Sequence, residues 1–299
     1  MVFDRIVGEP RIEAGADVMD GVSPLRQFAQ VDSHFRGRDN FDCRQQRTVG
    51  IVRTTKTAGY FVDVFRSKVE KGEEKYHDYI YHNVGEWGTG NVSPERSEPR
   101  KRSLEGWERG TGNGEQGTGS LDSDSGFGYE YFKTLGAWQG GGEWCGRVDY
   151  GRGISTGIHL ATIEGDEVYQ LEGPKAFRHY NKRVGEKPCP AVLLRRKGEA
   201  WDRPFVVVYE PFGDGVKEIV GAISAEAVRG ASKVTAVAVA FKDDPNRRDV
   251  VLVADAEKAA FSYDGIKFRT TFAVISYRGG RIVNVYAGDG TSDRGARSR

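Results

Sequence analysis

The sequence predicts an all-β protein, an antiparallel β-sandwich of two or more stacked sheets with a long Gly-rich insertion. Three observations predict it: many short segments alternate apolar and polar residues, turn residues separate most of them, and only one weak helical pattern occurs, at 225–230. Alternation places every second side chain on the same face of a strand. We therefore expect facing sheets whose inward side chains form the core.

Strand candidates follow one another along most of the chain. The first five are 25–31, 47–52, 60–65, 76–82 and 157–163. The next seven are 191–196, 204–210, 218–224, 233–241, 249–254, 266–276 and 281–287. The pairs Asp214-Gly215, Asp264-Gly265 and Gly279-Gly280 lie between neighbouring candidates and are typical of tight hairpins.

Glycine is concentrated in one stretch of the chain. Of the 40 glycines, 19 lie between residues 85 and 157. The first part of this stretch is too polar to form a core of its own. The predicted organisation is therefore a first part of the sandwich at 1–84, a flexible insertion at 85–126, the remainder of the sandwich at 127–289 and a disordered tail at 290–299.

Composition excludes several classes of partner. The chain has 44 basic and 43 acidic residues, and a nucleic-acid binder would carry a basic surplus. No apolar run approaches the ~18 residues of a membrane span, and the first 15 residues lack the apolar core of a signal peptide. We expect no nucleic-acid or membrane partner, and the chain itself leaves the localisation unknown.

Histidine and cysteine residues predict neither a metal site nor a catalytic site. On a regular strand His77 and Tyr79 share one face, whereas Asp78 and His82 share the other, so these side chains and Asp63 supply no convincing ligand set. The remaining residues of this kind are isolated in the sequence and form no nucleophile motif: Cys43, Cys145, Cys189, His34, His159 and His179. A catalytic pair of carboxylates that comes together only in the folded protein stays an open alternative, although no local sequence pattern indicates one.

Aromatic residues are candidates for a carbohydrate-binding surface, because flat rings stack on sugars. The candidate binding residues are Trp144, Trp201, His77, Tyr79 and Arg66; Trp138, Tyr129, Tyr131 and Tyr209 could extend the platform. Sandwich cores use the same aromatic residues for packing, so both interpretations stay open.

Two stretches resemble a known family. Residues 46–85, QRTVGIVRTTKTAGYFVDVFRSKVEKGEEKYHDYIYHNVG, combine an arginine-containing strand, a Y-x-V-D-V-F-R strand, a glycine hairpin and an H-D-Y…H segment. Residues 192–211, VLLRRKGEAWDRPFVVVYEP, read as strand, turn and strand. Together they resemble the C-terminal β-domain of the heparinase II/III-like polysaccharide lyases.

The resemblance implies a parent enzyme that cleaves acidic polysaccharide, such as a glycosaminoglycan, by β-elimination. A base removes the proton α to the uronate carboxylate and an acid protonates the leaving oxygen. In this family the catalytic residues lie mostly on an N-terminal α/α toroid, and some members hold zinc in the sandwich. The upstream H-x-H and D-P-G elements are absent here, so no catalytic residue is carried over.

The leading hypothesis is a C-terminal β-sandwich fragment of such a lyase that lacks the toroid and is inactive alone, which leaves its status as an enzyme uncertain. Its expected partners are an acidic polysaccharide and the toroid of the parent. No cofactor is evident in the chain, zinc is possible in the full-length parent, and the family implies a periplasmic or secreted location. The alternatives are a non-catalytic carbohydrate-binding module and a purely structural or interaction domain.

Overall fold

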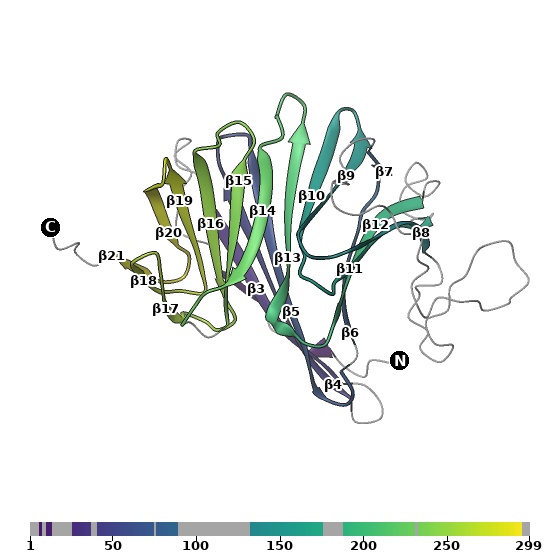
Figure 1. Ribbon diagram of the computed structural model, residues 1–299, viewed down its shortest axis with the longest axis horizontal. Helices are drawn as coiled ribbons and strands as arrows, with labels where there is room; N and C mark the ends of the chain where they lie inside the picture. The colour runs from purple at the N-terminus through teal and green to yellow at the C-terminus, as the bar shows by residue number, and fades with distance from the viewer. Residues whose placement is uncertain are drawn as a thin grey trace, which may run out of the picture.

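The computed structural model describes residues 6–7, 10–13, 26–36, 41–74, 76–88, 132–175, 188–230 and 233–294. These residues form strands in four antiparallel sheets and no helix, which confirms the predicted all-β class (Figure 1). Accordingly, none of the described segments is an apolar helix of membrane-spanning length.

A nine-stranded central sheet organises the molecule. Its strands in spatial order are β1 (Ile6–Val7), β3 (Arg26–Arg36), β4 (Asp42–Arg53), β5 (Gly59–Lys71), β13 (Ala200–Gly213), β10 (Ile154–Ala161), β9 (Glu143–Gly151) and β7 (Glu86–Trp87), with β2 (Pro10–Glu13) also paired to β3. Strand β13 joins β5 to β10, so segments distant in sequence become neighbours at the centre of this sheet.

Three smaller sheets complete the fold. The four-stranded sheet contains β6 (Tyr76–His82), β12 (Pro188–Lys197), β11 (Glu167–Lys175) and β8 (Lys133–Gln139). The five-stranded sheet contains β14 (Val220–Ala227), β15 (Val234–Phe241), β16 (Arg247–Ala254), β19 (Phe272–Arg278) and β20 (Arg281–Ala287). The three-stranded sheet contains β17 (Ala260–Tyr263), β18 (Ile266–Arg269) and β21 (Thr291–Arg294).

Alternating side chains of the central sheet contribute to two different cores. Val62, Val64 and Val208 pack against the five-stranded sheet, whereas Phe205 and Val207 pack against the four-stranded sheet. The three-stranded sheet covers the outer face of the five-stranded one. The central sheet therefore has a layer on each face, as the five-stranded sheet in front of β3 and β5 shows in Figure 1.

Two of the three predicted hairpins form, whereas the turn at Asp214-Gly215 joins β13 to β14, which belong to different sheets. Asp264-Gly265 and Gly279-Gly280 have positive φ at both positions, the backbone that a two-residue hairpin turn requires. Strand β14 continues to Ala227, so the weak helical pattern at 225–230 does not form a helix, because pairing with β15 outweighs local preference.

A short strand forms near the beginning of each of the two segments predicted to lack structure. Glu86–Trp87 pairs with β9, and Thr291–Arg294 pairs with β18. Backbone hydrogen bonds to an existing sheet account for both strands, although each is short. The rest of the predicted insertion, 89–126, and the last five residues, 295–299, lie outside the described residues.

Candidate functional site

The five candidate carbohydrate-binding side chains lie in the interior. Their exposed fractions range from 1% to 7%: Arg66 1%, Trp201 3%, Tyr79 3%, Trp144 4% and His77 7%. Arg66, Trp144 and Trp201 lie on strands of the central sheet, and His77 and Tyr79 lie on β6 of the sheet that packs against it; at these positions packing between sheets closes the side chains to a polymer. The structure does not bring these five together as one exposed platform.

Trp201 and Arg66 have internal partners. Arg44 and Lys68 place cationic groups 4.6 and 5.1 Å from the centre of the Trp201 ring, and Trp201 Nε1 donates to Asp255 at 2.9 Å. The Arg66 guanidinium donates to Thr235 Oγ1 at 2.9 Å and to the backbone carbonyl of Trp201. The tryptophan ring therefore contacts cationic side chains of this chain, and Arg66 links the central and five-stranded sheets.

Trp144 and His77 are likewise held inside. The Trp144 ring meets Trp87 and Trp138 edge-on, with centroids 6.4 and 5.7 Å apart. His77 Nδ1 lies 2.7 Å from Ser67 Oγ, and its Nε2 lies 3.0 Å from Glu74. Both side chains stabilise the packing between sheets.

A buried polar network joins the central sheet to β6. Asp63, 1% exposed, accepts hydrogen bonds from the Arg47 guanidinium and, at 2.6 Å, from the Tyr79 hydroxyl. The Tyr79 and Tyr209 hydroxyl oxygens are 2.5 Å apart. Burial raises the pKa of both tyrosines well above the usual value, and the negative charge of Asp63 adds to the effect. We call Arg47, Asp63, Tyr79 and Tyr209 the tyrosine network.

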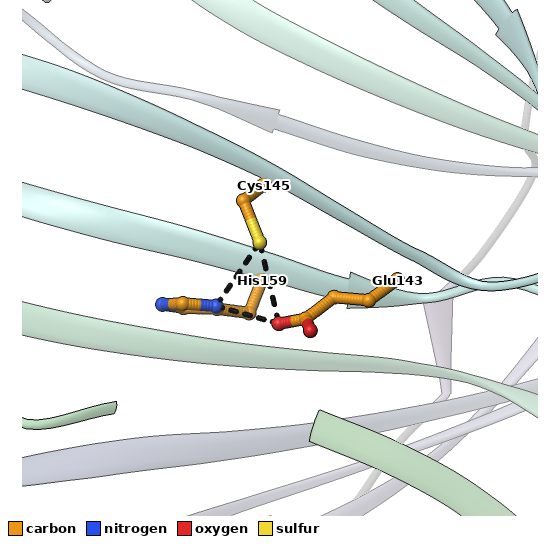
Figure 2. Close-up of side chains that lie close together, drawn as sticks. All are labelled: Glu143, Cys145 and His159. Carbon is orange, nitrogen blue, oxygen red and sulfur yellow. Dashed lines mark hydrogen bonds and ion pairs between the residues drawn. The ribbon is translucent and has the colours of Figure 1, made fainter. Parts of the chain in front are cut away.

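A second cluster lies on the opposite face of the central sheet, toward the five-stranded sheet. Cys145 on β9 pairs directly with His159 on β10, and Glu143 is two residues from Cys145 on the same face. Cys145 Sγ is 3.3 Å from His159 Nδ1 and 3.2 Å from Glu143 Oε1, and the third distance, Nδ1 to Oε1, is 2.8 Å. Figure 2 shows the three atoms converging on one point. We call Glu143, Cys145 and His159 the cysteine cluster.

The other ring nitrogen of His159 faces two more carboxylates. His159 Nε2 and Glu218 Oε1 border the same space beside Gly157: a methyl group placed on Gly157 would lie 3.4 Å from the first atom and 3.7 Å from the second. Ligand atoms of His159, Glu210 and Glu218 also lie within 4.8 Å of one another. Glu210, which is fully buried, accepts hydrogen bonds from the backbone N–H groups of Ile219 and Val220. The imidazole is therefore flanked by acceptors on both sides, and Glu210 is held rigidly.

A small pocket adjoins the cysteine cluster. It has a volume of about 240 Å³ and lies between the β9–β10–β13 region of the central sheet and β14; Glu143, Thr162, Arg203 and Ser224 are among its lining residues. Pockets for drug-sized ligands usually measure about 300–1,000 Å³. This pocket is therefore too small to be a polysaccharide cleft.

One apolar surface of the central sheet carries no layer among the described residues. Ala29 pairs with Val49, and Val49 pairs with Asp63, so all three lie on the face toward the four-stranded sheet. On this face Ala29, Val31, Val49 and Ile51 are half-buried, and none belongs to a described hydrophobic core. We call these four residues the β3–β4 face.

In the sequence Cys145 and His159 are isolated residues that belong to no motif. A hairpin centred on Arg152 would have brought the two residues together, because antiparallel pairing about Arg152 places position 145 opposite position 159. Finding it required recognition of β9, whose glycines at 146 and 151 interrupt the alternation of apolar and polar residues.

The fold and its site define a stacked antiparallel β-protein with a buried tyrosine network and a cysteine–histidine–glutamate cluster. No family model matches the chain. The chain is similar to an endo-acting ulvan lyase of Formosa agariphila, with 28% identity over 277 residues, which cover 87% of this chain and 32% of that protein. The likeness is thus to a polysaccharide lyase, and the chain spans about a third of the length of this curated relative.

Proposed function

We propose that this chain is the β-sandwich portion of a heparinase II/III-like polysaccharide lyase that acts on an acidic, uronate-containing polysaccharide. The observation that carries the proposal is the alignment, which covers 87% of this chain but only 32% of the ulvan lyase. In this proposal the chain supports the elimination reaction, and an α/α toroid domain supplies the catalytic side chains.

The chemistry of the tyrosine network supports a non-catalytic role. β-Elimination needs a base that can take the proton α to the carboxylate and an acid at the leaving oxygen. Tyr79 and Tyr209 have a pKa raised by burial, and the Tyr79 hydroxyl is engaged with Asp63. A buried, protonated phenol that already donates its proton is a poor base, so the network stabilises the scaffold.

The β3–β4 face supports the docking of a further domain. Its apolar side chains are only half-buried, and the ulvan lyase contains a long region outside the aligned part. Covering Val31, Val49 and Ile51 with an apolar surface would contribute about 25 cal/mol per Å² removed from water. We propose this face as the contact with the toroid.

A chimera tests the proposal. The aligned third of the Formosa ulvan lyase is replaced by this chain, and the absorbance of unsaturated uronate is followed with ulvan as substrate. We expect turnover by the chimera, and none by this chain alone on ulvan, heparin, heparan sulfate or alginate. Turnover by the chain alone would contradict the non-catalytic role, and a folded but inactive chimera would contradict the lyase assignment.

Variants of the chimera test the docking face. Val49→Lys together with Ile51→Lys should lower turnover by at least tenfold, because two charges would have to be buried at the contact. The matched control is Val283→Lys on β20, where the valine is already 61% exposed. Equal turnover in both variants would rule out docking at the β3–β4 face.

A further inference from the structure

We propose that the cysteine cluster binds a divalent metal ion of the zinc type, through Cys145 Sγ, His159 Nδ1 and a carboxylate oxygen of Glu143. This site goes beyond the proposed lyase function and does not depend on it. It joins neighbouring strands β9 and β10 at a point where three ligand atoms of different chemistry converge (Figure 2).

The distances between the three ligand atoms are slightly shorter than those of a tetrahedral site that holds an ion. With Zn–S near 2.3 Å and Zn–N or Zn–O near 2.0–2.1 Å, tetrahedral ligand atoms lie roughly 3.3–3.6 Å apart. The three observed distances are 2.8, 3.2 and 3.3 Å. Expansion by a few tenths of an ångström, through side-chain torsions of Glu143 and Cys145, would admit the ion without moving the strands.

The ligand set selects the class of metal. A thiolate and an imidazole are soft or borderline ligands that favour zinc, whereas magnesium and calcium take oxygen ligands almost exclusively. Three protein ligands leave the fourth tetrahedral position for water. Glu143, whose side chain is 19% exposed, also lines the small pocket, so solvent reaches this side of the cluster.

The surroundings of His159 complete the arrangement. A histidine that binds a metal through one ring nitrogen usually donates its other N–H to a carboxylate, which orients the ring. Glu210 and Glu218 lie on the Nε2 side, and backbone N–H groups hold Glu210 in place. Glu210 is therefore a positioning residue for the proposed metal ligand.

The charges around the sulfur favour a metal site over a nucleophilic cysteine. A nucleophile must become a thiolate, and the Glu143 carboxylate oxygen 3.2 Å from Sγ opposes a second negative charge there. A cation between the two removes the repulsion. The same contact that would hinder a nucleophile supplies a metal ligand.

Cobalt is the spectroscopic probe. The full chain, freed of metal with a chelator, is titrated with Co²⁺, and thiolate-to-cobalt charge-transfer absorption and the visible bands of tetrahedral cobalt are recorded. We expect one Co²⁺ per chain, displaced by Zn²⁺. Cys145→Ser and His159→Ala should each weaken Zn²⁺ binding by at least about 100-fold, and Glu210→Gln by about tenfold.

Cys189→Ser is the matched control, because Cys189 is also half-buried and outside any disulfide; it should bind cobalt like the wild type. A second measurement needs no variant: Zn²⁺ should slow alkylation of Cys145 by iodoacetamide, followed by mass spectrometry of the wild-type peptides. Absence of the charge-transfer band in the wild type, unchanged binding by Cys145→Ser, or alkylation of Cys145 unaffected by Zn²⁺ would each overturn the proposal.

Discussion

The tyrosine network and the cysteine cluster occupy opposite faces of the same central sheet and use their polar groups in different ways. In the tyrosine network the buried carboxylate is paired with a cation: Asp63 accepts from Arg47 and Tyr79, and the Tyr79 and Tyr209 hydroxyl groups are in contact. In the cluster three groups share one point, and Nδ1 of His159 is within reach of both Cys145 and Glu143.

This difference separates scaffold from binding site. Buried polar groups with distributed partners connect sheets and stabilise the fold. In the cysteine cluster, by contrast, a thiol, an imidazole and a carboxylate each direct an atom that can bind a metal ion at the same point. Stability measurements and metal titrations should therefore distinguish the two regions.

Removal of the Asp63 carboxylate should have the largest effect. Asp63→Ala deprives the Tyr79 hydroxyl and the Arg47 guanidinium of a fully buried acceptor, and we expect a loss of about 3 kcal/mol in the free energy of unfolding in urea. Arg278→Ala is the control, because it removes an arginine–aspartate pair at a side chain that is 68% exposed and should cost less than about 1 kcal/mol. Equal losses would show that the network contributes no more than a surface pair.

Zinc should stabilise the wild type by an amount of similar size. At a Zn²⁺ concentration 100 times the dissociation constant, the free energy of unfolding should rise by about 2.7 kcal/mol. Cys145→Ser should show almost none of this increase, whereas Asp63→Ala should keep it because the network lies on the other face of the sheet. Thermal unfolding with and without Zn²⁺ measures the effect, and equal stabilisation of wild type and Cys145→Ser would place the ion elsewhere.

Loss of a single hydroxyl from the network should have a smaller effect. Tyr79→Phe keeps the ring contacts with Phe65 and Phe205, whose centroids are 6.0 and 6.1 Å from that of Tyr79, but removes the hydrogen bond to Asp63. We expect a loss of about 1 kcal/mol in urea unfolding and an unchanged cobalt spectrum. A more stable variant would show that the network is retained for a reason other than stability.

The smallest effect concerns acid stability at Asp289. Burial raises the pKa of this carboxyl, but hydrogen bonds from Thr271 and Thr270 outweigh it and hold the pKa below the usual value. A carboxyl with a lowered folded-state pKa contributes stability above its unfolded pKa, and this is lost as the pH falls through the folded value. The stability difference between wild type and Asp289→Asn should therefore shrink between pH 7 and about pH 3. A difference independent of pH would contradict this assignment.

The local parts of the fold were predictable from sequence. Alternation located strands such as β6 and β20 at their observed bounds, and the Asp-Gly and Gly-Gly pairs marked turns because their positive φ angles depend on nearest neighbours. Strands β8 and β9 were not predicted, because glycines such as Gly136 and Gly146 interrupt their alternation of apolar and polar residues. The candidate 266–276 is two strands, β18 and β19, separated at Thr270 and Thr271, which bond to the distant Asp289.

The all-β class, most of the strands and their turns follow from the amino-acid sequence, because they depend on alternation and on residues next to one another. Which face of each strand is covered depends on how the sheets pack, because alternation distinguishes two faces of a strand but does not show that sheets pack on both. For this reason Trp144, Trp201, His77, Tyr79 and Arg66 lie inside instead of on a glycan-binding surface. Tertiary structure also brought Glu143, Cys145 and His159 to one point, because the register of a hairpin sets which side chains meet across it.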